Sequence, residues 1–295
     1  MRKIIVIVGP TSAGKTAVSV ELARAIGGEI VSADSRQVYR GLNIGTGKVT
    51  PEEMQGVPHH LLDVADPKEA FSAGEYAKEA RTAVDTITER GHVPVVVGGT
   101  GFYIDALSGG VSLPDVPPNP GLRKELAEKS LEELRTELFG LDPERAKTVD
   151  TKNRVRLVRA IEIARALGSV PRPSPERLYD LCWLGVALPR AELEKKIHTR
   201  LLARLAAGML KEAERLHEEG LSYERMEELG LEYRYMARHL KGTLSYDGMV
   251  SQLETEIRKY AKRQMTWFKR NKAITWFSPG EKTEMLRAVQ GFLER

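Results

Sequence analysis

The chain has 295 residues, of which 41% are hydrophobic and 29% are charged, and its formal net charge is +4. This balance is typical of a globular protein of one or two domains, and it allows an acidic partner without requiring one. No apolar stretch reaches the roughly 18 residues of a membrane-spanning helix, and no leader precedes the first predicted strand, so we expect a cytoplasmic protein outside the membrane. The single cysteine, Cys182, excludes an internal disulfide and a cysteine-cluster zinc site. Its apolar neighbours predict a small buried side chain.

The first predicted strand and the loop after it carry the strongest motif. Residues 4–8 are apolar and mostly β-branched, which predicts a buried strand of a parallel sheet. A helical pattern follows over residues 17–26. The loop between them fits G-x-x-x-x-G-K-[ST], the pattern of a phosphate-binding loop, with the residues Gly9, Pro10, Thr11, Ser12, Ala13, Gly14, Lys15 and Thr16.

A loop of this kind binds phosphate for physical reasons. Its backbone N–H groups point inward and the following helix adds the positive end of its dipole. Lys15 would supply a point charge, and the Thr16 hydroxyl would be a magnesium ligand. The simpler alternative is a glycine turn that only joins strand to helix. The motif also does not separate a nucleotide kinase, an ATPase and a transferase with a diphosphate leaving group.

Two further predicted strands, 29–33 and 93–97, end in polar or glycine-rich loops. The first is followed by Asp34-Ser35-Arg36-Gln37, and the second by Gly98-Gly99-Thr100-Gly101. Ligands bind beyond the carboxyl ends of the strands in open α/β sheets, so we expect these loops to lie beside the phosphate loop. Position alone leaves Asp34 as a ligand associated with magnesium, a catalytic base or a helix cap. For Thr100, the alternative is that the glycines merely allow a tight turn.

Two proline-rich segments, 111–120 and 168–175, enclose charged helical patterns over 123–139, 143–149 and 153–167. We therefore predict a helical inserted domain over 113–178 and a core formed by 1–112 plus 179–295. The fold class predicted is α/β: a parallel sheet of the P-loop NTPase type, flanked by helices, with a small all-helical insertion. The last inserted helix carries several arginines that spread over half its circumference, so a solvated face is as consistent as a phosphate-binding one. They include Arg154, Arg156 and Arg159.

The C-terminal part begins with a predicted strand over 181–188 and a long helix from 189 through 209. Lys196, Arg200 and Arg204 recur every four residues on that helix and form one cationic stripe. The alternative is ordinary surface pairing with Glu192, Glu194 and Glu212. The helix predicted over 251–270 interleaves basic and aromatic residues, which suits a nucleic-acid groove, although its aromatic residues also recur at the spacing of a core face.

Five segments in chain order resemble the bacterial tRNA dimethylallyltransferases, and together they cover the chain nearly end to end. They are the phosphate loop, Ser32-Ala-Asp-Ser-Arg-Gln-Val-Tyr39, Gly56-Val-Pro-His-His-Leu-Leu-Asp63, Val97-Gly-Gly-Thr-Gly-Phe-Tyr103 and Tyr260-Ala-Lys-Arg-Gln-Met-Thr-Trp267. Residues 153–162 are similar to the arginine-rich segment of that family. The chain departs from the family at Gly230-Leu231-Glu232-Tyr233, where Gly-Tyr and a polar pair are usual.

The resemblance implies transfer of a dimethylallyl group from dimethylallyl diphosphate to the N6 amine of the adenosine on the 3′ side of the tRNA anticodon. Residues 9–16 would bind the diphosphate together with Mg²⁺ on Thr16. Catalysis would rest on Lys15, Asp34, Thr100 and Arg200, with Asp34 as general base and Arg200 on the diphosphate. ATP would then be unnecessary.

For the tRNA, the resemblance implies binding of the anticodon stem-loop by a monomer, with the target adenosine flipped out of its stack. The residues implied in tRNA contacts are Asp34, Ser35, Arg36, Gln37, Thr100, Arg123, Arg154, Arg156 and Arg159. Two other classes remain: a small-molecule or nucleotide kinase, which the loop alone favours, and a non-catalytic RNA-binding protein that uses the loop as a phosphate clamp.

Overall fold

The computed structural model describes residues 1–111, 113–171 and 176–295. It divides the chain into two compact units. The first contains Met1–Ser108 and Arg177–Arg295, and the second contains Gly109–Glu176. The proline-rich segments predicted as linkers fall in part on Ser112 and residues 172–175, which lie outside the described residues.

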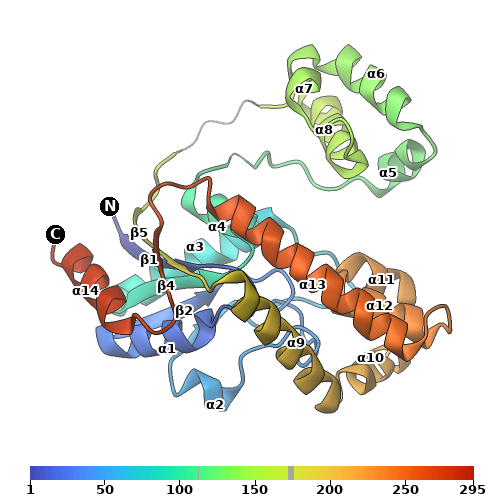
Figure 1. Ribbon diagram of the computed structural model, residues 1–295. Helices are drawn as coiled ribbons and strands as arrows, with labels where there is room; N and C mark the ends of the chain where they lie inside the picture. The colour runs from blue at the N-terminus through green and yellow to red at the C-terminus, as the bar shows by residue number, and fades with distance from the viewer. Residues whose placement is uncertain (112, 172–175) are drawn as a thin grey trace. The chain divides into compact units, whose positions relative to one another are not determined.

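The first unit is built on one sheet whose strands are all parallel, in the order β3-β2-β4-β1-β5-β6. Figure 1 labels β1, β2, β4 and β5 of this sheet. The strands are β1 (Lys3–Val8), β2 (Gly28–Ser32), β3 (His59–His60), β4 (Val93–Gly98), β5 (Asp180–Val186) and β6 (Thr275–Phe277). The predicted α/β fold with a parallel sheet is confirmed. The strand before the phosphate loop, β1, lies in the interior of the sheet between β4 and β5.

Helices cover both faces of this sheet. α1 (Lys15–Ile26) and α14 (Lys282–Leu293) share one hydrophobic core with Ile5 and Ile7 of β1. On the other face Ile4 and Val6 pack with α3 (Ala73–Glu89), α4 (Gly101–Ser108) and α13 (Tyr246–Phe268). Because β1 is buried on both faces, its sequence is continuously apolar instead of alternating.

Further helices extend the second face. They are α9 (Arg190–Ala206), α10 (Met209–Glu218), α11 (Tyr223–Leu229) and α12 (Leu231–Leu240), while the short α2 (Pro51–Met54) follows β2. The single helix predicted from 189 through 209 is wrong at its end. Gly208 has a φ of 97° and precedes α10 as its N-cap, so the chain turns there and starts a new helix.

The second unit contains α5 (Pro120–Ala127), α6 (Leu131–Leu141), α7 (Pro143–Thr148) and α8 (Arg154–Leu167). Its own core includes Leu126, Leu138 and Leu157. The prediction of one helix over 123–139 is wrong, because Ser130 and Glu133 form a capping box that starts α6 afresh. Among the described residues, none of the helices is long and apolar enough to cross a membrane.

Cys182 lies on β5 and is half-buried, not fully buried as the sequence predicts. Burial raises the pKa of its thiol to about 11, so the side chain is protonated at neutral pH.

The ends of β2 and β4 approach each other closely. Ala33 N–H donates to the Val97 carbonyl at 2.7 Å, and Thr100 N–H donates to the Ala33 carbonyl at 3.1 Å. A Cβ atom on Gly98 would lie 2.1 Å from that same Ala33 oxygen. Only a glycine fits at this position, and the two polar loops after these strands are therefore held side by side.

We expect Gly98→Ala to lower the free energy of unfolding by about 3 kcal/mol, because the atoms that the new methyl group meets belong to backbone. Gly291→Ala is the matched control. It lies in α14 with no neighbour within 4 Å, and it should raise stability by about 0.5 to 1 kcal/mol through helix propensity. Urea unfolding measures both. Shifts of the same sign and size would contradict the close approach.

Candidate active site

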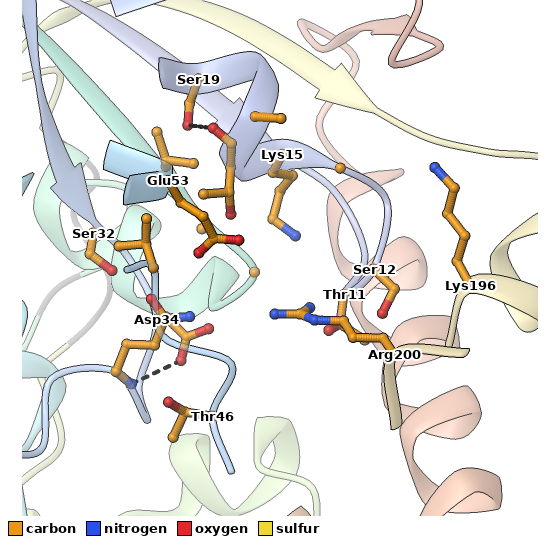
Figure 2. Close-up of a pocket in the computed structure, with 18 of the residues that line it drawn as sticks. Thr11, Ser12, Lys15, Ser19, Ser32, Asp34, Thr46, Glu53, Lys196 and Arg200 are labelled. Atoms are coloured by element: carbon orange, nitrogen blue, oxygen red, sulfur yellow. Dashed lines mark hydrogen bonds between the residues drawn. The ribbon is translucent and has the colours of Figure 1, made fainter. Parts of the chain in front are cut away.

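A cavity of about 670 Å³ opens at the carboxyl edge of the sheet, between the loops after β1, β2 and β4 and the helix α9. Its lining brings together many of the residues that the sequence predicts for the site. These are Thr11, Ser12, Gly14, Lys15, Thr16, Asp34, Gln37 and Arg200. Figure 2 shows the Lys15 amine, the Asp34 carboxylate and the Arg200 guanidinium directed toward the same space, whereas the Lys196 amine points away from them.

The loop between β1 and α1 has the backbone geometry of a phosphate-binding loop. Gly9 has a φ of 151°, and a Cβ atom there would lie 2.1 Å from the Val186 carbonyl oxygen of β5. No side chain caps the first turn of α1, whose N-cap is Gly14. The N–H groups of that turn therefore keep their capacity to bind an anion, with the helix dipole adding to the attraction.

Of the four cations that line the cavity among the described residues, Lys15 and Arg200 are in a partly desolvated setting. Burial lowers the pKa of Lys15 to about 8, against a raising effect of Asp34 and a further lowering effect of Arg200. Burial also lowers the pKa of the Arg200 guanidinium, and Arg204 adds to that effect. The cavity is lined by Lys15, Lys195, Lys196 and Arg200 and by the carboxylates of Asp34, Glu53 and Glu192, so it carries a small excess of positive charge that favours an anion.

Asp34 is fixed by a tight turn. Its Oδ1 accepts the N–H groups of Arg36 at 2.9 Å and Gln37 at 3.3 Å. These hydrogen bonds agree with the capping role that the sequence left open. The carboxylate also lines the cavity, so it is placed to contact a ligand there as well. It is an anchored carboxylate that lies near Lys15 and Arg200.

Thr100 joins the loops after β2 and β4. Its Oγ1 accepts the Ser35 N–H at 3.0 Å and donates to the Ser35 Oγ at 3.3 Å. Thr100 therefore does more than permit a glycine turn: it fixes the position of Ser35 next to Asp34.

The cationic stripe on α9 splits into separate contacts. Arg200 Nη2 donates to the Gly47 carbonyl at 3.1 Å. Arg204 donates to the Gly45 carbonyl at 2.7 Å and pairs with Glu232 at 3.0 Å. The alternative of surface pairing with Glu192, Glu194 and Glu212 is therefore wrong for Arg200 and Arg204. Glu232, the partner of Arg204, belongs to the segment that departs from the family pattern.

Gln264 on α13 is a site residue whose role sequence reasoning missed. It lies on the buried face of this helix. Its Oε1 accepts the Thr11 N–H at 2.8 Å, and its Nε2 donates to the Gly99 carbonyl at 3.0 Å. One amide thus ties the phosphate loop to the loop that carries Thr100. A polar side chain at a core position of an amphipathic helix was the available signal, because buried amides need partners.

Four arginines predicted to contact tRNA lie in the second unit, and none of them lines the cavity. Arg123 forms two hydrogen bonds with the Glu162 carboxylate, at 2.8 and 2.9 Å, and Arg159 also contacts Glu162. Arg154 donates to the Leu126 and Ala127 carbonyls at the end of α5, and Arg156 pairs with the exposed Asp150. Their part in tRNA binding stays a prediction.

The cavity also offers oxygen ligands suited to a divalent cation. The Thr16 hydroxyl and the carboxylates of Asp34 and Glu53 line it. In the part of the chain that the structure describes, no group of three or more His, Cys, Asp or Glu residues could hold a metal. Mg²⁺ does not need one, since it binds through few protein oxygens together with phosphates and water. The donor set therefore fits Mg²⁺ bound along with a diphosphate.

An all-parallel sheet, a phosphate-binding loop after an interior strand and a cavity at the carboxyl edge define an α/β phosphate-binding protein of the P-loop type. The family model described as IPP transferase matches residues 37–271, and the chain belongs to this family of transferases. The resemblance found in the sequence is confirmed.

Relatives with similar sequences cover nearly all of the chain. A tRNA dimethylallyltransferase 1 of Geotalea daltonii is 46% identical over 90% of this chain and 86% of its own length. A tRNA dimethylallyltransferase of Bacillus cytotoxicus is 37% identical over 99% of this chain and 96% of its own.

Solved structures agree with the sequence relatives. The full-length tRNA isopentenylpyrophosphate transferase of Bacillus halodurans is 35% identical with a TM-score of 0.76, covering 100% of this chain and 97% of that one. A eukaryotic dimethylallyltransferase acting on tRNA is 26% identical with a TM-score of 0.80, covering 91% and 70%.

We expect the affinity for sulfate, measured without divalent metal, to fall as the pH rises through about 8. Sulfate keeps its charge over this range, whereas Lys15 loses its proton there because its pKa is lowered to about 8. Isothermal titration calorimetry at several pH values measures the effect. Lys15→Met should bind sulfate more weakly and show a flat profile over the same range. A parallel decline in both proteins would assign the titration to another group.

Proposed function

We propose that this protein transfers the dimethylallyl group of dimethylallyl diphosphate to the N6 amine of the adenosine next to the anticodon, on its 3′ side, giving N6-(dimethylallyl)adenosine in tRNA. The observation that carries this proposal is one cavity in which the desolvated cations Lys15 and Arg200 lie with the anchored carboxylate of Asp34. Membership in the IPP transferase family and the names of the relatives support it.

On the donor side, the bond between the allylic carbon and the diphosphate oxygen breaks, and its electron pair leaves with the diphosphate. Negative charge grows on the leaving group as this happens. The N–H groups of the phosphate loop, the Lys15 amine and the Arg200 guanidinium stabilise that charge, and burial strengthens the effect of the two side chains. The residues that would bind the loop side of the diphosphate are Gly9, Pro10, Thr11, Ser12, Ala13, Gly14, Lys15 and Thr16.

Mg²⁺ bound by Thr16, with Asp34 or Glu53 near it, would neutralise further charge on the diphosphate. No phosphoryl group moves, so the reaction consumes no ATP. The loop serves phosphate recognition alone.

On the acceptor side, the adenine amine is a weak nucleophile that must lose a proton as the carbon–nitrogen bond forms. Asp34 is the general base for this proton, and its turn holds it at the cavity wall. The adenosine has to leave the anticodon stack to reach the cavity. Asp34, Ser35, Arg36, Gln37 and Thr100 would contact the flipped base and its neighbours.

The Gly109–Glu176 unit is the natural candidate for a tRNA-contacting domain, with Arg123, Arg154, Arg156 and Arg159 near backbone phosphates of the anticodon stem-loop. We expect the protein to act as a monomer in the cytoplasm.

The test is incubation of the purified protein with unmodified tRNA, Mg²⁺ and labelled dimethylallyl diphosphate, with labelled ATP in a parallel reaction. Label should enter tRNA from the allyl donor without ATP. Turnover of ATP with an inert allyl donor would assign the loop to a kinase or an ATPase instead.

Asp34→Asn should lower kcat by about two to four orders of magnitude, because an amide keeps the Oδ1 acceptor of the turn but cannot take a proton. Affinity for tRNA should change little. Single-turnover rates and filter-binding affinities for the wild type and the variant measure the two effects separately. Equal losses in rate and affinity would make Asp34 a binding residue.

The tRNA affinity should fall steeply with salt, because lysines and arginines of the inserted unit and α13 would displace counterions from phosphates. Dissociation constants from low to physiological ionic strength give the slope. The double variant Arg154→Gln/Arg156→Gln should show a smaller slope than the wild type. A flat response in the wild type would refute these phosphate contacts.

A further inference from the structure

Glu212 on α10 is a buried carboxylate that does not line the cavity. Its Oε2 accepts the N–H groups of Asn43 at 3.0 Å and Ile44 at 2.8 Å. Its Oε1 accepts the Gly45 N–H at 2.9 Å and the Tyr233 hydroxyl at 2.8 Å. Among the described residues, no lysine or arginine forms an ion pair with it. Three consecutive backbone donors thus converge on one negative charge.

The loop held in this way leads directly to the cavity. The Gly45 carbonyl accepts Arg204, and the Gly47 carbonyl accepts Arg200 Nη2 at 3.1 Å and Gln37 Nε2 at 3.3 Å. A Cβ atom on Gly47 would lie 2.3 Å from Arg200 Nη2, so backbone and guanidinium are in direct contact. The Glu212 carboxylate therefore binds one end of a short loop, at Asn43 to Gly45, and the other end, at Gly47, contacts the Arg200 side chain.

We propose that Glu212 is a positioning residue for the diphosphate: it holds the loop from Asn43 to Gly47, and the Gly47 carbonyl in turn sets the Arg200 guanidinium at the cavity wall. Glu212 acts only through Arg200 and touches no substrate. This inference rests on the proposed function insofar as Arg200 binds a diphosphate.

A carboxylate suits this task and an amide does not. Glutamine has the same size but only one acceptor oxygen. If that oxygen stays with Gly45 and Tyr233, the NH₂ group faces the N–H groups of Asn43 and Ile44, donor against donor. The loop then loses two hydrogen bonds and is pushed away, with no change in volume.

The experiment is a double-mutant cycle on the binding of inorganic pyrophosphate with Mg²⁺, measured by calorimetry on the full chain. Glu212→Gln and Arg200→Gln should each weaken binding by about tenfold. The double variant should bind no more weakly than Arg200→Gln alone, because the carboxylate has nothing to position once the guanidinium is gone. Affinity for tRNA should be the same in the wild type and Glu212→Gln.

Glu214→Gln is the control: it makes the same chemical change on the exposed side of α10 and should leave pyrophosphate binding unchanged. If Glu212→Gln does not fold, Glu212→Asp withdraws the carboxylate while keeping its charge and enters the same cycle. Additive losses, unchanged binding in the Glu212 variant or a wild type that does not bind pyrophosphate would each overturn the inference.

The proposed reaction and the role of Glu212 are refuted by different results. A non-additive cycle in a protein that does not transfer the allyl group to tRNA would leave Glu212 in its role and refute the reaction. An active transferase with additive losses would support the reaction and refute the positioning role of Glu212.

Discussion

Parallel pairing of β2, β4, β1 and β5 brings the loops that follow these strands to one edge of the sheet. The contact of Gly98 with the Ala33 carbonyl tightens that edge, and the Gln264 amide fastens the phosphate loop to the Thr100 loop. The cavity therefore does not rest on one flexible segment. Asp34, Lys15 and Arg200 are carried by strand ends and a helix whose positions are determined by the hydrophobic cores on the two faces of the sheet.

The charged side chains at the cavity differ from those behind it in solvation and pairing. Burial keeps water from fully solvating Lys15 and Arg200, so their charges are unfavourable in the empty site. Binding of an anion is favourable because it compensates these charges. Glu212 and Glu232 lie behind these cations: Glu212 binds backbone N–H groups and the Tyr233 hydroxyl, and Glu232 pairs with Arg204. Neither carboxylate lines the cavity.

The sequence predicted the sheet, the phosphate loop and the convergence of three loops, because each depends on short-range pattern: an apolar β-branched run, glycines and a strand end. It could not predict that Glu212 binds the N–H groups of Asn43 to Gly45, since some 170 positions separate them and no periodicity connects them. The helix breaks at Gly208 and Ser130 were missed for another reason. Apolar residues continue at helical spacing across both positions, but Gly208 and Ser130 act as N-caps that start new helices there.

The ends of the inserted unit meet, since the Glu176 N–H donates to the Gly109 carbonyl at 3.0 Å. All residues that line the cavity belong to the other unit. A segment whose two ends coincide can be gained, lost or exchanged without threading a new path through its host, and a short turn would close the gap it leaves. Evolution could thus alter the insertion while the residues that line the cavity stayed unchanged.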